Sequence, residues 1–174
     1  MKKLLIVVDM QNDFIDAALG TPQAQEIVEK AVEKIRNFDG RIIATLDTHE
    51  QDYMDTQEGK HLPVSHCIRD SDGWQLNERV REALEEKGYI AVTKPTFGSV
   101  ELVEIIKKED EQREMQIQLI GLCTDICVVS NALLLKTNFP EARISVDASC
   151  CAGVTPEKHR AALMTMESCQ IEIL

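Results

Sequence analysis

The feature that most constrains the fold of this chain is a regular alternation of short apolar runs with segments of helical spacing. Residues 3–8 form an almost continuously apolar run that ends at Asp9, a pattern typical of a parallel strand covered on both faces. Four later runs end in the same way at polar residues or turn signals, and a candidate edge strand follows them; these segments are 42–46, 89–93, 115–120, 142–146 and 171–174. The chain is therefore expected to form a six-stranded, mainly parallel sheet.

Helices are expected between these strands. Thr21 and Pro22 form an N-cap with proline in the first turn, Gly88 ends a later helix, and Ser99 can cap the next one. The acidic stretch 107–114 is expected to be solvated helix ends and a turn. The expected helices lie at 21–35, around 80–88, after 99, at 124–136 and from 155 onward. This alternation predicts an α/β fold of three layers, with helices on both faces of a doubly wound sheet of Rossmann-like order 3-2-1-4-5-6.

Length and composition restrict the class of protein. A chain of 174 residues with 44% hydrophobic and 28% charged residues is expected to form one domain spanning 1–174. Its formal net charge of −11 would repel a phosphate backbone, so nucleic acid is not an expected partner. Asp9 and Asn12 interrupt the first apolar run before it could act as a signal peptide, and no run approaches the ~20 apolar residues that span a bilayer. The expected location is cytoplasmic, without a membrane partner.

Six cysteines occur at irregular spacings, at 67, 123, 127, 150, 151 and 169. They do not resemble a disulfide framework, so the thiols are expected to be reduced. Cys150, Cys151 and Cys169 are interpreted as buried or incidental thiols, and His159 as a packing or surface residue.

The segment 119–129, LIGLCTDICVV, combines a strand end with a helix start. Its apolar run stops at Gly121, and Thr124 opens a segment of helical spacing. Cys127 would lie in the first helical turn, where unpaired backbone N–H groups and the helix dipole lower a thiol pKa and favour the thiolate. The alternative is that Cys123 and Cys127 are small apolar fillers, as most free cysteines are.

Polar residues follow the ends of four expected strands. Asp9, Asp47 and Lys94 each lie at or just beyond a strand end, as does the turn that contains Cys127. With strand order 3-2-1-4-5-6, the first and fourth strands are neighbours, so Asp9 would lie beside Cys127, with Lys94 within reach. Taken singly, Asp9 could be a strand-end cap and Lys94 a surface residue.

An acid, a cation and a thiol at one edge of a sheet suit acyl transfer. The carboxylate of Asp9 can take the proton of the Cys127 thiol and give it to a leaving amine, while the Lys94 ammonium holds both groups in place. Backbone N–H groups at the start of the helix that begins near Thr124 would stabilise the oxyanion of a tetrahedral intermediate.

The long segment from the second strand to Trp74 has no sustained periodicity, and a loop of this length usually has a function. It begins with Asp47 and His49 and carries His66 further on. A carboxylate with two imidazoles suits zinc, iron or manganese, with open positions for water or substrate. The alternative is a solvated loop that has collected these residues, because Asp-x-His alone is a weak signal.

Three motifs resemble those of the isochorismatase-like cysteine hydrolases and, within that superfamily, of the nicotinamidase branch. They are VVDMQNDF at 7–14, KPTFGS at 94–99 and GLCTDICV at 121–128. The resemblance spans nearly the whole chain and implies that Asp9, Lys94 and Cys127 are catalytic. It also implies that a cis peptide precedes Cys123 and that the backbone amides of Cys123 and Cys127 form the oxyanion hole.

The resemblance extends to the long loop, where LPVSHC at 62–67 is similar to the family's last metal-binding segment. It implies a divalent metal held by Asp47, His49 and His66, with zinc as the first candidate and iron or manganese as the alternatives. Glu58 is the candidate fourth ligand, ahead of His61.

The resemblance is weaker for the substrate pocket. Phe14 is a candidate wall for a substrate ring. Leu62 stands where nicotinamidases usually carry a Trp, and the Trp of this chain, Trp74, follows the candidate metal ligand His66. Relatives are often homo-oligomers, and the same is expected of this chain.

The leading hypothesis is a metal-assisted cysteine amidase that cleaves a small carboxamide through a thioester, with nicotinamide to nicotinate and ammonia as the specific prediction. Isochorismate-cleaving members of the superfamily lack the nucleophilic cysteine, so Cys127 favours amide hydrolysis. One alternative is a related hydrolase of a non-aromatic amide or carbamoyl compound. A redox protein that uses Cys123 and Cys127 with the pair Cys150 and Cys151, and a non-catalytic binding module of the same fold, are the others.

Overall fold

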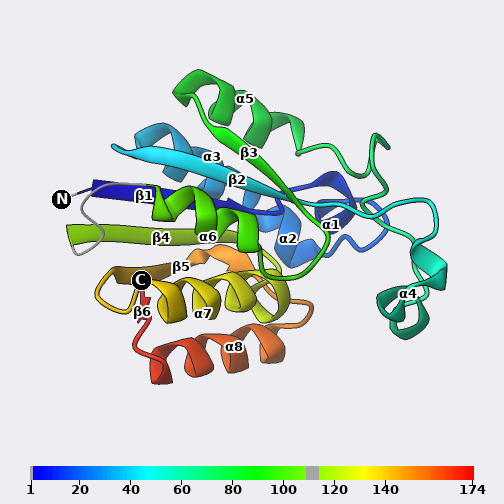
Figure 1. The fold of residues 1–174 in the computed structure, drawn as a ribbon. Coiled ribbons are helices and arrows are strands. Elements are labelled where there is room, and N and C mark those ends of the chain that lie inside the picture. The colour runs from blue at the N-terminus through cyan, green and yellow to red at the C-terminus, as the bar shows by residue number, and fades with distance from the viewer. Residues whose placement is uncertain (1, 109–113) are drawn as a thin grey trace.

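The computed structural model describes residues 2–108 and 114–174. Its centre is a six-stranded sheet in which every neighbouring pair of strands is parallel (Figure 1). The order is β3-β2-β1-β4-β5-β6, and the strands are β1 (Lys2–Val8), β2 (Arg41–Asp47), β3 (Ile90–Lys94), β4 (Met115–Leu122), β5 (Arg143–Ala152) and β6 (Glu172–Ile173). The predicted strand order is confirmed. Most of the acidic stretch 107–114, where a turn was expected, lies outside the described residues.

Helices cover both faces of the sheet (Figure 1). The helices of the described residues are α1 (Asn12–Ile15), α2 (Pro22–Glu26), α3 (Val28–Asn37), α4 (Gln57–His61), α5 (Glu78–Lys87), α6 (Val100–Lys107), α7 (Val129–Asn138) and α8 (Pro156–Ser168), of which α4 lies in the loop after β2 and belongs to neither core. The apolar sides of α3 and α5 pack on one face, and those of α6, α7 and α8 pack on the other. The predicted three-layer α/β/α architecture is confirmed. None of the helices in the described ranges is long and apolar enough to cross a membrane.

The central strand β1 divides its side chains between two apolar cores. Leu5 and Val7 belong to the core under α3 and α5, whereas Leu4 and Ile6 belong to the core under α6 and α7. Burial of each such side chain contributes about 1.5–3 kcal/mol relative to leaving it exposed. The double coverage explains the continuous apolar run, and it holds the carboxyl end of β1 between β2 and β4.

Several elements differ from the sequence-based expectation. The helix predicted over 124–136 begins with a π-type turn, Thr124–Val128, before α7. The helix predicted over 21–35 is divided into α2 and α3, with Ile27 at the junction. Strand β5 continues to Ala152 instead of ending at Val146. The apolar pattern stops early because Asp147 and Ser149 are polar, yet the backbone pairing continues beyond them.

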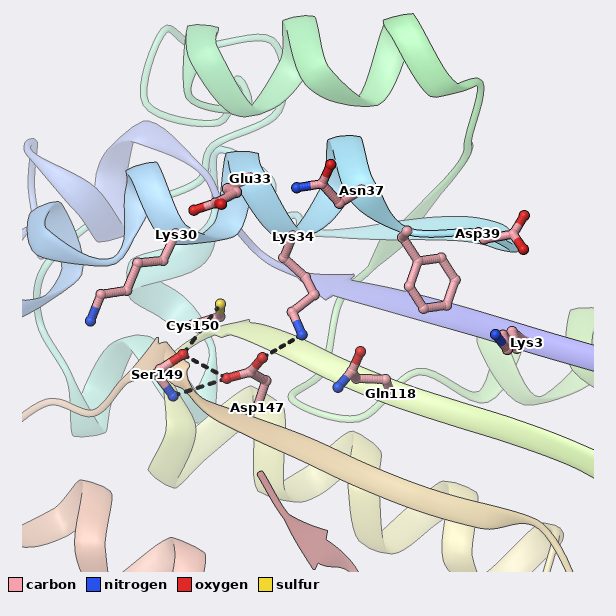
Figure 2. A pocket seen from close by; sticks show the side chains of 11 residues that line it. Lys3, Lys30, Glu33, Lys34, Asn37, Asp39, Gln118, Asp147, Ser149 and Cys150 are labelled. Carbon is pink, nitrogen blue, oxygen red and sulfur yellow. Dashed lines mark hydrogen bonds and ion pairs between the residues drawn. The ribbon is translucent and has the colours of Figure 1, made fainter.

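A groove of about 570 Å³ explains those polar residues of β5 (Figure 2). It lies between α3 and the part of the sheet formed by β4 and β5, where Gln118 is another of its lining residues. Lys34 of α3 crosses the groove to Asp147, with Nζ 2.6 Å from Oδ2, and Ser149 Oγ donates to Asp147 Oδ1 at 2.7 Å. The two strands therefore carry polar side chains on this face without interrupting the sheet.

Candidate active site and metal cluster

The carboxyl ends of β1, β3 and β4 bring three chemical groups together. Lys94 Nζ lies 2.7 Å from Asp9 Oδ2 and 3.3 Å from Cys127 Sγ. Each of the three residues is at most 3% exposed. The acid, the cation and the thiol expected at this edge of the sheet therefore form one buried network.

Further contacts hold Asp9 and Lys94 in this network. Thr45 of β2 donates its hydroxyl to Asp9 Oδ1 at 2.6 Å, and Lys94 Nζ donates to the Thr96 carbonyl at 3.1 Å. Lys94 Nζ also lies 3.4 Å from Asp47 Oδ1. Asp9 has a φ of 47°, a left-handed conformation that Asp tolerates better than most residues, and β1 ends just before this turn.

The surroundings of Cys127 favour the neutral thiol. Burial is the main cause that raises the pKa of Cys127, the Asp9 carboxylate raises it further, and Lys94 opposes them only in part. The expected lowering of the thiol pKa at the helix start is therefore wrong. Burial likewise raises the pKa of Asp9 against the attraction of Lys94. Burial disfavours the Lys94 ammonium, but the negative charges around it outweigh burial and raise the pKa of Lys94, so Lys94 stays charged. Because the Cys127 thiol is neutral, its ionisation requires a base.

The turn that carries Cys127 follows β4 directly. The Leu122–Cys123 peptide bond is cis, as the family resemblance implies, and residues Thr124–Val128 form a π-type helical turn that leads into α7. Gly121 has a φ of 119°, and a Cβ at this position would collide with the Val8 carbonyl. Glycine therefore allows β4 to approach the end of β1 closely.

A buried asparagine, Asn131, connects this turn to the loop that follows Lys94. Its Nδ2 donates to the Cys127 carbonyl at 2.8 Å and to the Phe97 carbonyl at 3.1 Å, and its Oδ1 accepts from the Ser99 N–H at 2.9 Å. Asn131 was not predicted from the sequence. Its only signal was a polar residue four positions after Cys127, one helical turn further along the chain.

Four side chains at the end of β2 and in the following loop form a cluster with the chemistry of a metal site. Asp47, His49, Glu58 and His66 each offer one ligand atom, and these atoms lie within 4.8 Å of one another. His49 Nε2 is 3.1 Å from Asp47 Oδ2 and 3.6 Å from Glu58 Oε1; for His66 Nε2 the distances are 3.6 Å and 3.8 Å. Two imidazoles and two carboxylates at this spacing fit zinc, iron or manganese. Of the two candidates for the fourth ligand, Glu58 belongs to the cluster and His61 does not.

Contacts around the cluster orient its members. His66 Nδ1 forms a hydrogen bond with the Val64 carbonyl at 2.8 Å, and this type of contact fixes the ring orientation of metal-binding histidines. Burial raises the pKa of Asp47, but hydrogen bonds from His49 and His66 and the charge of Lys94 hold it well below its usual range. Asp47 is therefore ionised, with one oxygen facing the histidines and the other facing Lys94.

Two buried side chains that follow Asp9 bind the backbone around the metal cluster. Gln11 Oε1 accepts from the Asp47 N–H at 2.7 Å, and Gln11 Nε2 donates to the Asp47 carbonyl at 2.9 Å. Asp13 Oδ2 accepts from the Cys67 N–H at 2.7 Å. Both residues lie in the motif at 7–14, but these roles were not predicted, because residue type alone does not show which backbone groups a polar side chain binds.

Aromatic side chains adjoin the histidines. The ring of Phe14 is 5.6 Å from that of His66, centroid to centroid. The ring of Tyr53, a residue that was not predicted from the sequence, is 5.0 Å from the same His66 ring. Trp74 packs against the core under α3 and α5. Leu62 is 37% exposed.

Cys150, Cys151 and Cys169 belong to neither the network around Cys127 nor the metal cluster. All six cysteines are free, and Cys169 is exposed. Cys150 and Cys151 belong to the two different apolar cores, on opposite faces of the sheet. His159 is not a simple surface residue, because its Nδ1 lies 2.8 Å from Thr124 Oγ1 at the start of the turn that carries Cys127.

Comparison with known proteins agrees with this geometry. Residues 3–174 match the family described as "Isochorismatase domain". The chain belongs to the isochorismatase family. The isochorismatase family protein PncA of Bacillus subtilis is 27% identical over 175 residues, which cover 94% of this chain and 93% of the relative.

Two crystal structures of isochorismatase-fold enzymes are similar to this chain over almost its full length. One is the pyrazinamidase of Pyrococcus horikoshii in complex with zinc, with 25% identity, a TM-score of 0.81 and coverage of 100% of this chain and 99% of that chain. The other is the nicotinamidase/pyrazinamidase PncA of Bacillus subtilis, with 25% identity, a TM-score of 0.83 and coverage of 99% of both chains. The predicted family, its nicotinamidase-related branch and the predicted fold are confirmed.

Proposed function

We propose that this chain is a metal-assisted cysteine amidase that hydrolyses nicotinamide to nicotinate and ammonia. The observation that carries the proposal is the position of Lys94 Nζ, 2.7 Å from Asp9 Oδ2 and 3.3 Å from Cys127 Sγ, beside a cluster of two histidines and two carboxylates. The similar enzymes of Pyrococcus horikoshii and Bacillus subtilis are named as pyrazinamidase and nicotinamidase, which supports an aromatic carboxamide as the substrate.

In the proposed acylation, Asp9 acts as the base for a thiol that is neutral at rest. Asp9 takes the proton of Cys127 as the sulfur bonds to the carboxamide carbon. The backbone amides of Cys123 and Cys127 are the proposed donors to the oxyanion. The C–N bond then breaks, Asp9 returns the proton to the departing nitrogen, and ammonia leaves a thioester on Cys127.

In the proposed deacylation, the same groups act on water. Asp9 takes a proton from a water molecule that attacks the thioester carbon, the C–S bond breaks, and the proton returns to the Cys127 sulfur. The products are a carboxylic acid and the original enzyme. Lys94 remains charged throughout, because its ammonium is held between carboxylates, and it keeps Asp9 and the sulfur at contact distance.

Asp47, His49, Glu58 and His66 are the proposed ligands of a divalent metal, with zinc as the first candidate. Zinc is supported by the donor set of the cluster and by its presence in the similar pyrazinamidase. When bound, the metal supplies a Lewis-acidic position that can bind the ring nitrogen of the substrate or its ordered water. Phe14 is the proposed wall for the substrate ring, supported by its contact with His66.

The test is ammonia release by the purified, zinc-loaded protein. Nicotinamide should be turned over faster than any member of a panel of non-aromatic amides and carbamoyl compounds at the same concentration. No release of ammonia from nicotinamide at high enzyme concentration would contradict the proposal.

A second candidate is a related hydrolase of a non-aromatic amide. The observation that favours it is the partly exposed Leu62, at the position where nicotinamidases usually carry a tryptophan. The same panel decides between the two, since a non-aromatic compound would then be the best substrate. A redox role has less support, because the six thiols are free and Cys150 and Cys151 lie on opposite faces of the sheet.

The proposed setting is a single domain that works in the cytoplasm as a homo-oligomer. The family match over residues 3–174 supports the single domain, and the six free thiols suit a reducing compartment. Light scattering coupled to size-exclusion chromatography tests the oligomeric state, and elution at the mass of one chain would contradict it.

A further inference from the structure

The side chain of Gln11 completes the edge of a strand where a neighbouring strand has ended. Strand β1 pairs with β2 only as far as Val8 and Thr45, and Asp9, with its φ of 47°, gives the Thr45 carbonyl a last backbone hydrogen bond. The backbone of Asp47, two residues further along β2, has no β1 residue opposite it in the ladder. On the other side, β3 continues and pairs Lys94 with Asp47.

The amide of Gln11 takes the place of the missing strand. It accepts from the Asp47 N–H at 2.7 Å and donates to the Asp47 carbonyl at 2.9 Å, the two backbone groups that a longer β1 would have bound through two of its residues. Its second N–H donates to the Trp74 carbonyl at 2.8 Å. Gln11 is 0% exposed, so water cannot replace these contacts.

We propose that Gln11 is a positioning residue that sets the direction of the Asp47 carboxylate and thereby the affinity of the cluster for its metal. The carboxylate is a member of the metal cluster and a neighbour of Lys94, so a small rotation of the Asp47 backbone would displace ligand oxygens. Gln11 binds both backbone groups of Asp47 on the β1 side, and the Thr48 N–H donates to the Lys94 carbonyl at 2.9 Å on the β3 side, so both contacts oppose that rotation. The inference rests on the proposed metal site and adds a residue that does not touch the metal.

The experiment compares Gln11→Met with a matched control, Asn131→Leu. Both variants remove a buried amide that makes three hydrogen bonds, but Asn131 binds the backbone around Cys127 instead of that around Asp47. The affinity for Zn²⁺ is measured by competition with a chromophoric chelator, and unfolding temperatures are measured beside it. Gln11→Met should lower the affinity by about 10- to 100-fold, the usual effect of losing a contact that orients a ligand.

The control should keep its Zn²⁺ affinity within about twofold of the wild type, although it is also destabilised. Unchanged affinity in Gln11→Met, or an equal loss in Asn131→Leu, would overturn the inference. Should Gln11→Met not accumulate as folded protein, Gln11→Glu, which has the same shape and lacks both N–H donors, is judged by the same criteria. A wild-type protein that binds neither zinc, iron nor manganese would overturn the metal assignment together with this inference, whereas wild-type binding with unchanged Gln11 variants overturns the inference alone.

Discussion

The two halves of the site are built in different ways. The network of Asp9, Lys94 and Cys127 is carried by the ends of three strands, so its spacing follows from the order of the sheet. The metal cluster takes only Asp47 from a strand, and its other members come from the loop that follows β2. Asp47 belongs to both halves, because one of its oxygens faces Lys94 and the other faces the histidines.

This difference predicts how each half responds to substitution. Strand ends are held by a continuous backbone ladder and by burial, so the thiol network should be sensitive mainly to loss of its own functional groups. The loop carries an isolated bridge between His49 and Ile68 in place of a continuous ladder. Side chains also bind the backbone at and near its ends, Gln11 that of Asp47 and Trp74, and Asp13 that of Cys67. The metal half should therefore also be sensitive to residues that touch neither metal nor substrate.

The largest effect is expected for Cys127→Ala. Turnover of nicotinamide should fall by about 10⁴-fold or more, because no other group can form the thioester. Zn²⁺ affinity should stay at the wild-type value, because Cys127 is not a member of the metal cluster. Ammonia release and chelator competition measure the two quantities, and a variant with more than a tenth of the wild-type rate would exclude Cys127 as the nucleophile.

Asp9→Asn should lower turnover by about 10²- to 10⁴-fold, because the variant lacks the base. The same substitution should lower the pKa of Cys127, since the Asp9 carboxylate is one of the causes that raise it. This titration is followed by thiolate absorbance near 240 nm. The variant that combines Asp9→Asn with Cys127→Ala gives the background from the other thiols. A higher or unchanged thiol pKa would mean that Asp9 does not act on the sulfur.

Removal of the metal should change the reactivity of the Cys127 thiol less than it changes turnover. Chelation, or His66→Ala, is expected to lower nicotinamide turnover by about 10- to 100-fold, while the alkylation rate of Cys127 by iodoacetamide changes by less than about threefold. Zinc should restore the chelated wild type but not the variant. Full activity in the metal-free protein would separate the cluster from the reaction.

The smallest effect is expected for Cys123→Ala. The proposed contribution of Cys123 is its backbone amide, and its partly buried side chain lies against the core under α3 and α5, apart from the core that contains Cys127. Turnover should stay within about twofold of the wild type. A loss comparable with that of Cys127→Ala would show that the two cysteines act as a pair.

The meeting of Asp9, Lys94 and Cys127 at one edge could be predicted from the sequence, because the apolar runs of β1, β3 and β4 end near these residues and a Rossmann-like strand order makes the first and fourth strands neighbours. The ionisation of Cys127 could not, since it depends on burial and on the distance to Asp9, neither of which is a local property of the sequence. The helix start indicated a lowered thiol pKa, and the structure raises it.

The metal cluster in the loop was harder to predict from the sequence. The Asp47 and His49 spacing is a weak signal by itself, and the choice of Glu58 over His61 depended on family resemblance until the geometry supported it. The length of β5 was underestimated because Asp147 and Ser149 line a polar groove (Figure 2). These polar residues interrupt the apolar pattern of the sequence, whereas the strand itself continues.

The central claim is that one sulfur attacks the carboxamide of a substrate held beside the metal cluster. A crystal structure of the zinc-loaded protein with nicotinaldehyde tests it most directly. A nucleophilic thiol adds to the aldehyde carbon, and the adduct persists because the aldehyde has no leaving group. We predict a covalent bond between Cys127 Sγ and that carbon, with the pyridine ring between Phe14 and the cluster of Asp47, His49, Glu58 and His66. An aldehyde bonded to another residue, or an unmodified Cys127 at saturating ligand, would contradict the account.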